Sequence, residues 1–266
     1  MTYPPDRTWE GADAYEAFMG RWSRPLARKF LEWLQPPRSA HWLEVGCGTG
    51  ALTSAIFDRC EPASVVACDP SAQFLEHARS QVSDDRASFV VAGAENLPRR
   101  EGGFDAVVSG LVLNFLPDPA QVVTSIRQRL RTGGTFAAYV WDYSEGMEFL
   151  RAFWEEAIAA DPQAAARAEH LGFPICRPPA LVSLLETAGF AQAQVGSLEI
   201  PTDFADFDDY WEPFLRGTGT GPSFVTNLDP PSRERLRDRL KRRLEPGADG
   251  RIRLKARAWA VRGSAV

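Results

Sequence analysis

Cysteine and histidine are scarce in this chain, which has four cysteines and three histidines among 266 residues. The cysteines form no Cys-x-x-Cys pair, and their spacing fits no zinc-binding pattern. We therefore expect neither a metal site nor a disulfide framework. The thiols of Cys47, Cys60, Cys68 and Cys176 are interpreted as reduced and mostly buried side chains of a cytosolic protein.

Long apolar runs and excess positive charge are also missing. No stretch approaches the ~20 apolar residues of a membrane-spanning helix, and the first residues, MTYPPDRTWEGADAYE, lack the apolar centre of a signal peptide. The formal net charge of −5 opposes general binding to nucleic acids. We therefore expect a cytoplasmic protein with neither a membrane nor a nucleic acid as its partner.

The central part of the chain alternates between short apolar runs and helix-like segments. Strands are predicted at 41–45, 64–68, 87–91, 104–109 and 135–141, helices at 50–59, 72–82 and 120–130, and a turn at Gly133-Gly134. This alternation predicts an α/β fold with a Rossmann-like, mostly parallel sheet and helices on both faces.

The flanking segments predict more helices and two further strands. Helices are expected at 12–35 with an interruption at Gly20, and at 147–160, 178–188 and 232–244; alternating strands are expected at 191–201 and 252–261. The excursion at 203–249 holds an acidic aromatic segment and the glycine-rich stretch GTGTGP, which is interpreted as a flexible hinge. The helix expected at 232–244 is rich in arginine. Its leucines Leu236, Leu240 and Leu244 recur every four residues, which predicts that it packs by one face.

The strongest motif is LEVGCGTG at 43–50. Gly46 and Gly48 allow a sharp turn and a close approach of the backbone to a ligand, and the helix that follows favours negative charge at its N-terminus. Asp69 follows the second strand at the spacing expected of an acid that binds ribose hydroxyls. These features fit either a dinucleotide or a nucleoside cofactor, and Asp69-Pro70-Ser71 also fits a plain helix-capping turn.

Together with the later motifs, this pattern resembles a known family. LEVGCGTG, CDPS, AENLP, FDAVVSGLVLNF and RTGGTF occur in the order found in class I S-adenosyl-L-methionine-dependent methyltransferases, most like their UbiE-like small-molecule group, over residues 11–142. The resemblance implies methyl transfer to O, N or C of a small metabolite, with S-adenosyl-L-homocysteine as product. It also implies a seven-stranded sheet whose antiparallel last strand lies beside the sixth.

We interpret the chain as one domain with a helical cap, residues 1–266. Its parts would be an N-terminal helical cover (11–35), a cofactor-binding core (36–142), substrate-side helices and cap (143–190 and 203–249), and a C-terminal strand pair (191–202 and 251–262). The expected cofactor-binding residues are Trp22, Glu44, Gly46, Cys47, Gly48, Thr49, Asp69, Pro70, Ala94, Glu95, Ser109 and Gly110.

The resemblance assigns roles to some of these residues. Glu44 would face the amino group of the methionine moiety, Asp69 the ribose hydroxyls, and Ala94 and Glu95 the adenine. Gly93 stands where the family often has an Asp that holds the adenine amine. Trp22 would cover the sulfonium by a cation–π contact, although helix packing explains it equally well.

Methyl transfer from a sulfonium mainly requires alignment of the nucleophile, so a general base is optional. The candidate catalytic residues are Asp142 and Tyr143 after the fifth strand and Asn114 after the fourth; alternatively, Asp142 caps the following helix. The candidate substrate residues are Trp141, His170, Tyr210 and Trp211. Residues 206–214 fit equally well a helix with an apolar stripe and a solvated acidic face.

Two rival functions remain open at this point. One is an NAD(P)-dependent Rossmann oxidoreductase, because Gly46, Gly48 and Ala51 fit the dinucleotide pattern. The other is an S-adenosyl-L-methionine-binding protein without turnover. In each case the expected partner is a small molecule, and the expected state is a monomer or homodimer.

Overall fold

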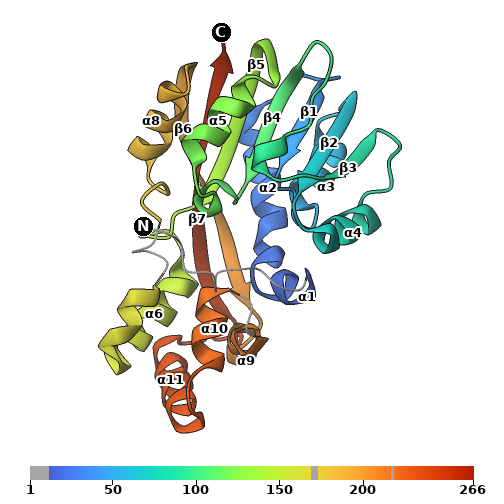
Figure 1. Ribbon diagram of the computed structural model, residues 1–266. Coiled ribbons are helices and arrows are strands. Elements are labelled where there is room, and N and C mark those ends of the chain that lie inside the picture. Colours follow the sequence, from blue (N-terminus) through green and yellow to red (C-terminus); the bar gives the residue numbers. More distant parts are fainter. Residues whose placement is uncertain (1–11, 169–172, 217–218) are drawn as a thin grey trace. The chain divides into compact units, whose positions relative to one another are not determined.

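The computed structural model describes residues 12–168, 173–216 and 219–266, and its centre is one seven-stranded sheet (Figure 1). The strand order is β3-β2-β1-β4-β5-β7-β6; the pairs formed among β1 to β5 are parallel, and the last strands are antiparallel. The strands are β1 His41–Val45, β2 Ser64–Asp69, β3 Ala87–Val91, β4 Phe104–Gly110, β5 Leu130–Trp141, β6 Phe190–Phe204 and β7 Ile252–Ala265. This architecture confirms the expected fold class.

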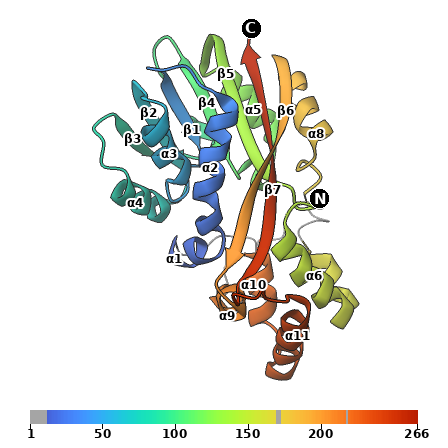
Figure 2. The same ribbon diagram turned by 180° about the vertical axis from the view of Figure 1, so that it is seen from behind.

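Helices connect the strands and lie on both faces of the sheet: Figure 1 shows α5 in front of it, and Figure 2, from behind, shows α2 in front. These helices are α2 Arg21–Leu34, α3 Ala51–Arg59, α4 Ala72–Gln81, α5 Pro119–Arg127 and α8 Pro178–Thr187. Short polar side chains fix the starts of α4 and α5, because Ser71 accepts the N–H of Phe74 and Asp118 that of Gln121. Gly189, at φ 81°, follows the end of α8.

The chain groups into two compact units. Unit 2 comprises residues 23–140, 175–198 and 258–266. Unit 1 comprises residues 1–22, 141–174 and 199–257, of which 1–11, 169–172 and 217–218 lie outside the described residues. The expectation of a single domain with the boundaries given above stays a prediction.

Unit 1 is mostly helical and has its own aromatic core. Its elements are α1 Ala12–Tyr15, a π-helical turn Glu16–Gly20, α6 Glu148–Ala160, 3₁₀ turns Pro162–Arg167 and Glu212–Arg216, α9 Phe207–Trp211, α10 Thr220–Thr226 and α11 Pro230–Arg243. The rings of Phe153 and Phe214 stack at 4.4 Å. Leu236 and Leu240 in α11 and Leu244, the residue that caps its end, are buried, which confirms that this helix packs by one face.

Three local predictions were wrong. The helix predicted to reach residue 130 ends at Arg127, and Gly133-Gly134 lie within β5, where the pairing with β4 shifts register between Phe104 and Ala106. The glycine-rich stretch is not an open hinge in its described part, because Gly221 is buried in α10, where a Cβ would lie 3.1 Å from the Phe214 ring. Gly217 lies outside the described residues.

Among the residues that the structure describes, no helix combines the length and the apolar character that a membrane crossing demands.

Candidate cofactor site

Four loops of unit 2 leave the sheet at the same edge. The parallel register places Val45 beside Cys68, Cys68 beside Val90 and Glu44 beside Val108, so the carboxyl ends of β1, β2, β3 and β4 are aligned. Ligands of open α/β sheets bind outside this edge. The predicted cofactor-binding residues of unit 2 lie at or next to this edge of the sheet.

The loop after β1 exposes backbone where a side chain would interfere. Gly46, Gly48 and Gly50 have φ of 73°, 52° and 87°, a region that favours glycine. A Cβ on Gly46 would lie 2.5 Å from a methyl group of Val112. For a Cβ placed on Gly48, the described residues other than its two chain neighbours bring no atom within 4 Å. The N–H groups of Gly46 and Cys47 donate to the Cys68 carbonyl at 2.8 and 3.0 Å, which anchors the loop to β2.

The neighbouring residues of that loop face inward. Cys47 packs with Ala67 and Leu75, and burial raises the pKa of its thiol, so the thiol stays protonated. Thr49 is buried as well. The buried side chains of Cys47 and Thr49 pack beneath the loop, so only the backbone of these residues is available to a ligand.

Asp69 ends β2 and is held in place by two backbone groups. Its Oδ2 accepts the N–H of Gly48 at 2.9 Å and its Oδ1 accepts the N–H of Ser71 at 2.8 Å. Only 7% of Asp69 is exposed, and burial raises the pKa of its carboxyl, whereas the two backbone hydrogen bonds lower it. Each carboxylate oxygen can accept more than one hydrogen bond, so the capping turn and a ribose-binding role are compatible. Pro70, next in the chain, is exposed.

Glu44 lies within β1 and is 1% exposed. Thr53 on α3 donates its hydroxyl to Glu44 Oε2 at 2.5 Å. Burial, with a smaller contribution from the charge of Asp69, raises the pKa of Glu44 to about 8. A buried carboxyl with so high a pKa favours a cationic partner. The sequence motif did not indicate Thr53, although a buried acid demands a donor.

The loop after β4 is fixed by close packing. Ser109 is buried and donates its hydroxyl to the Val45 carbonyl at 2.9 Å. A Cβ on Gly110 would lie 2.5 Å from the hydroxyl oxygen of Tyr139, so glycine is required there. Leu111 adopts φ 63°, which is unusual for a branched residue, and donates its N–H to the Tyr139 carbonyl. The backbone at this loop is therefore held in a strained conformation.

The loop after β3 continues into the 3₁₀ turn Ala94–Asn96. Ala92 donates its N–H to the Asp69 carbonyl at 3.1 Å, which ties this loop to β2. Glu95 is exposed, and its two carboxylate oxygens lie 2.5 Å from the position of a Cβ on Gly93. The Glu95 carboxylate thus occupies the space that a side chain at residue 93 would fill.

Asn114 lies in the 3₁₀ turn Leu113–Phe115 of unit 2 and is 5% exposed. Among the described residues, none accepts a hydrogen bond from its Nδ2. A buried amide donor without a partner is costly unless a ligand or water supplies an acceptor.

The remaining predicted residues belong to unit 1. Asp142 is 1% exposed; it accepts from Nε and Nη2 of Arg257 at 2.8 and 2.5 Å, from the Ser144 hydroxyl at 2.8 Å and from the Glu145 N–H at 3.2 Å. This paired carboxylate favours the structural alternative over a free base. The ring of Tyr143 packs against Phe173 at 4.8 Å.

The predicted aromatic residues of unit 1 are buried in its core. Trp141 and Trp211 are 2% and 4% exposed. Tyr210 is fully buried and donates its hydroxyl to the Phe149 carbonyl at 3.0 Å. Trp22 packs edge-on against Phe204 at 5.4 Å. His170 lies outside the described residues.

The acidic residues of the same segment face away from this core. Asp208 is exposed, and Asp209 pairs with Arg21 at 2.7 and 3.1 Å. Segment 206–214 therefore has the arrangement of the alternative interpretation, an apolar stripe with an acidic face. The pairing of Asp209 with Arg21 and of Asp142 with Arg257 was not predicted, because the partners lie far apart in the sequence. Among the described residues, no histidine, cysteine and carboxylate cluster could hold a metal ion.

Strand order and sheet edge together define the class of protein. In a dinucleotide-binding Rossmann fold the order is 3-2-1-4-5-6, whereas here an antiparallel β7 lies between β5 and β6, the arrangement of class I S-adenosyl-L-methionine-dependent methyltransferases. Residues 43–138 match the family model described as "Methyltransferase domain". Residues 43–138 are therefore similar to a methyltransferase domain, which agrees with the class that the sheet order indicates.

Two curated relatives and one solved structure illustrate the similarity. A malonyl-[acyl-carrier protein] O-methyltransferase of Geobacter sulfurreducens is 32% identical over 163 residues, 60% of each chain. A demethylmenaquinone methyltransferase of Lactiplantibacillus plantarum is 36% identical over 100 residues, 36% of this chain and 42% of that protein. The chain thus spans less than two thirds of the length of these relatives.

The solved structure is the Haemonchus contortus phosphoethanolamine N-methyltransferase 2 in complex with S-adenosyl-L-methionine. It aligns with a TM-score of 0.57 at 17% identity and covers 98% of this chain and 58% of that chain. At this identity the comparison supports the shared fold.

Proposed function

We propose that this protein transfers the methyl group of S-adenosyl-L-methionine to O, N or C of a small metabolite and releases S-adenosyl-L-homocysteine. The observation that carries the proposal is Asp69, whose carboxylate is held by the N–H groups of Gly48 and Ser71. The Cβ position of Gly48 is open to solvent as far as the described part of the chain goes, its two chain neighbours apart. A fixed acid next to bare backbone suits a nucleoside whose ribose presents two hydroxyls.

The residues at the sheet edge fit this cofactor. Asp69 accepts from the ribose hydroxyls, and Glu44 provides a buried carboxyl for the ammonium of the methionine moiety. Glu95, whose carboxylate fills the side-chain space of Gly93, accepts from the adenine amine beside Ala94. The other proposed cofactor contacts are made mainly by backbone, at Gly46, Cys47, Gly48, Thr49, Pro70, Ser109 and Gly110.

The cofactor supplies a sulfonium methyl that is already activated for in-line displacement. The protein has to align the nucleophile and exclude water, which is worth roughly 7–11 kcal/mol when the geometry is good. Asn114 is proposed to orient the substrate, because its buried Nδ2 has no acceptor among the described residues. No general base is required at this site.

The candidates in unit 1 are assigned different roles by their contacts. We interpret Asp142 as a positioning residue that acts through Arg257 and the turn at Ser144, rather than as a base. Tyr143 remains a candidate for orienting the substrate. The burial of Trp22, Trp141, Tyr210 and Trp211 favours core packing, and His170 stays an untested candidate.

The partner, the location and the oligomeric state of the protein are also proposals. A small-molecule partner is supported by the name of the demethylmenaquinone methyltransferase relative, and the acidic net charge of −5 opposes nucleic acid. We propose a cytoplasmic location, no membrane partner, and a monomer or homodimer.

The rival functions are separated by a labelling experiment combined with two binding measurements. S-adenosyl-L-methionine labelled in its methyl group is incubated with the protein and a fractionated cell extract, and labelled products are identified by mass spectrometry. Label in a small metabolite, lost with the Asp69→Ala variant, is expected. Tight binding of S-adenosyl-L-homocysteine without any labelled product would leave a non-catalytic binding protein, and thermal stabilisation by NAD(H) alone would indicate an oxidoreductase.

A further inference from the structure

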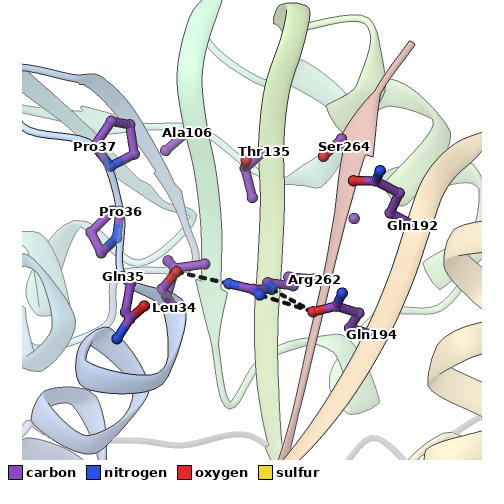
Figure 3. Close-up of a pocket in the computed structure, with 11 residues that line it drawn as sticks. Leu34, Gln35, Pro36, Pro37, Ala106, Thr135, Gln192, Gln194, Arg262 and Ser264 are labelled. Carbon is purple, nitrogen blue, oxygen red and sulfur yellow. Dashed lines mark hydrogen bonds between the residues drawn. The ribbon is translucent and has the colours of Figure 1, made fainter.

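Unit 2 contains a cavity that the proposed function does not use. It has a volume of about 200 Å³ and lies where the end of α2 faces the sheet (Figure 3). Small residues form its floor, among them Ala106 on β4, Thr135 on β5 and Ser264 on β7, while Gln35 and Gln192 stand on opposite sides.

This cavity is separate from the cofactor edge. Ala106 pairs with Thr135 of β5 and with Trp42 near the start of β1, whereas the cofactor loops follow the ends of these strands. The cavity therefore lies toward the amino-terminal ends of the parallel strands, and none of the residues proposed to bind S-adenosyl-L-methionine lines it.

Among the described residues that line the cavity, Arg262 alone carries a charged side chain. Its Nη1 donates to the Leu34 carbonyl at 3.0 Å, and its Nε and Nη2 donate to Gln194 Oε1 at 3.1 and 2.8 Å (Figure 3). Its guanidinium also lies 5.3 Å from the centre of the Trp33 ring. The guanidinium is held rigidly, and no carboxylate among the described residues pairs with it.

Several donors in the cavity have no partner. An arginine has five N–H groups, and three of those of Arg262 are engaged by the contacts above. The hydroxyls of Thr135 and Ser264 and the side-chain amides of Gln35 and Gln192 make no hydrogen bond or ion pair with any described residue. The cavity thus offers positive charge and donors, and its lining residues carry no negative side chain.

Two of the residues at the rim are also conformationally costly. Gln35 and Gln192 have φ of 48° and 55°, the left-handed region that favours glycine. Non-glycine residues held there concentrate at ligand sites. A glutamine that keeps its amide at such a position, facing a cavity, is consistent with a contact to a ligand.

From these observations we propose that this cavity binds a compact anion, a small metabolite that carries a phosphate or carboxylate group. Arg262 would bind the anionic group, and the hydroxyls of Thr135 and Ser264 with the amide of Gln192 would donate to its remaining oxygens. The cavity is smaller than the ~300–1,000 Å³ of sites for drug-sized ligands, so the ligand is a small one. Rigid arginines are well suited to phosphate and carboxylate groups.

The test uses the full-length protein with saturating S-adenosyl-L-homocysteine, so that the cofactor site does not contribute. Isothermal titration calorimetry measures the binding of inorganic phosphate and, in a second arm, of malate, at constant ionic strength. Arg262→Gln is compared with Arg100→Gln, a matched control, because Arg100 also donates to backbone carbonyls, those of Glu101 and Gly103. The two arms distinguish a phosphate ligand from a carboxylate ligand.

We expect at least one of the two anions to bind the wild type, with the Kd raised tenfold or more by Arg262→Gln and unchanged by Arg100→Gln. Because Arg262 also holds the end of α2, Gln192→Gly provides a second variant that leaves this contact intact. It should weaken anion binding severalfold while it raises the melting temperature, since glycine relieves the left-handed backbone. Absence of binding by both anions, or equal affinity in the wild type and both cavity variants, would overturn the proposal.

Discussion

At the scale of single residues, Asp69 and Glu44 are two buried acids on neighbouring strands with different surroundings. Asp69 receives two backbone N–H groups, which stabilise its ionised form, whereas Glu44 receives one hydroxyl and is almost fully buried. The lower pKa is therefore expected at Asp69. An ionised acid suits hydroxyl donors, and a carboxyl that ionises only beside a cation suits an ammonium.

Replacing Asp69 by Ala should weaken the binding of S-adenosyl-L-homocysteine by about tenfold or more. The change removes hydrogen bonds to a charged group, which are worth ~1.5–3 kcal/mol each. Calorimetry measures the effect, and Asp58→Ala, an exposed acid on α3 of the same unit, serves as the control. Unchanged affinity in the Asp69 variant would remove this residue from the site.

Replacing Glu44 by Gln should change how stability depends on pH. The pKa of Glu44 is about 8 in the folded protein against 4.5 normally. Between these values the folded state holds a proton that the unfolded state has lost, so the free energy of unfolding of the wild type falls as pH rises through this window. The neutral glutamine avoids this loss.

Urea denaturation at pH 5, 7 and 9 measures that effect. The stability of Glu44→Gln relative to the wild type should increase from pH 5 to pH 9, with Glu76→Gln, an exposed acid on α4, as the control. A constant difference at the three pH values would mean that Glu44 ionises normally.

At the scale of elements, the sequence predicted best where apolar runs have clear ends. The bounds of β1 and β3 agree with the prediction, because glycine or polar residues stop both runs. The prediction failed at β5, where Gly133-Gly134 resembled a turn but continue the strand, and at α10, where buried glycine is accepted because the Phe214 ring lies close by. In both cases tertiary packing determines the local conformation, and a local sequence pattern carries no information about that packing.

The candidate site shows the same limit. The order of motifs predicted the loops and Asp69, which the structure brings to one sheet edge, where Asp69 contacts Gly48 and Ser71. The pairing of Asp142 with Arg257 spans 115 residues and has no local signal. The role given to Asp142 therefore shifts from a possible base to a positioning residue.

That pair links Asp142, the residue after β5, to Arg257 of β7 and should be important for stability. Arg257→Met would leave a carboxylate of 1% exposure without its cation, and loss of a buried partner costs about 3 kcal/mol. Chemical denaturation measures the loss. The control is Arg253→Met on the same strand, whose pair with Asp249 is about half exposed on both sides and should contribute less than ~1 kcal/mol. Equal effects of the two variants would contradict the importance of the Asp142–Arg257 pair.

At the scale of the whole molecule, the two compact units are not separate in sequence. Strands β5, β6 and β7 each contribute residues to both units. From this shared membership of the strands we predict that the two units unfold together, as one domain would.

Scanning calorimetry should accordingly show a single transition, with a van't Hoff enthalpy close to the calorimetric enthalpy. The same transition should shift upward as a whole when S-adenosyl-L-homocysteine is added, because a ligand of the native state stabilises whatever unfolds with it. Two transitions, of which only one responds to the ligand, would show that the units are independent domains.

The most direct test of the account is a crystal structure of the protein with S-adenosyl-L-homocysteine. The account predicts that the ribose hydroxyls lie within hydrogen-bond distance of the Asp69 carboxylate and that the nucleoside contacts the backbone at Gly48. Electron density for the ligand elsewhere, or a loop at 46–50 that closes against Asp69 and leaves no room for it, would contradict the central claim.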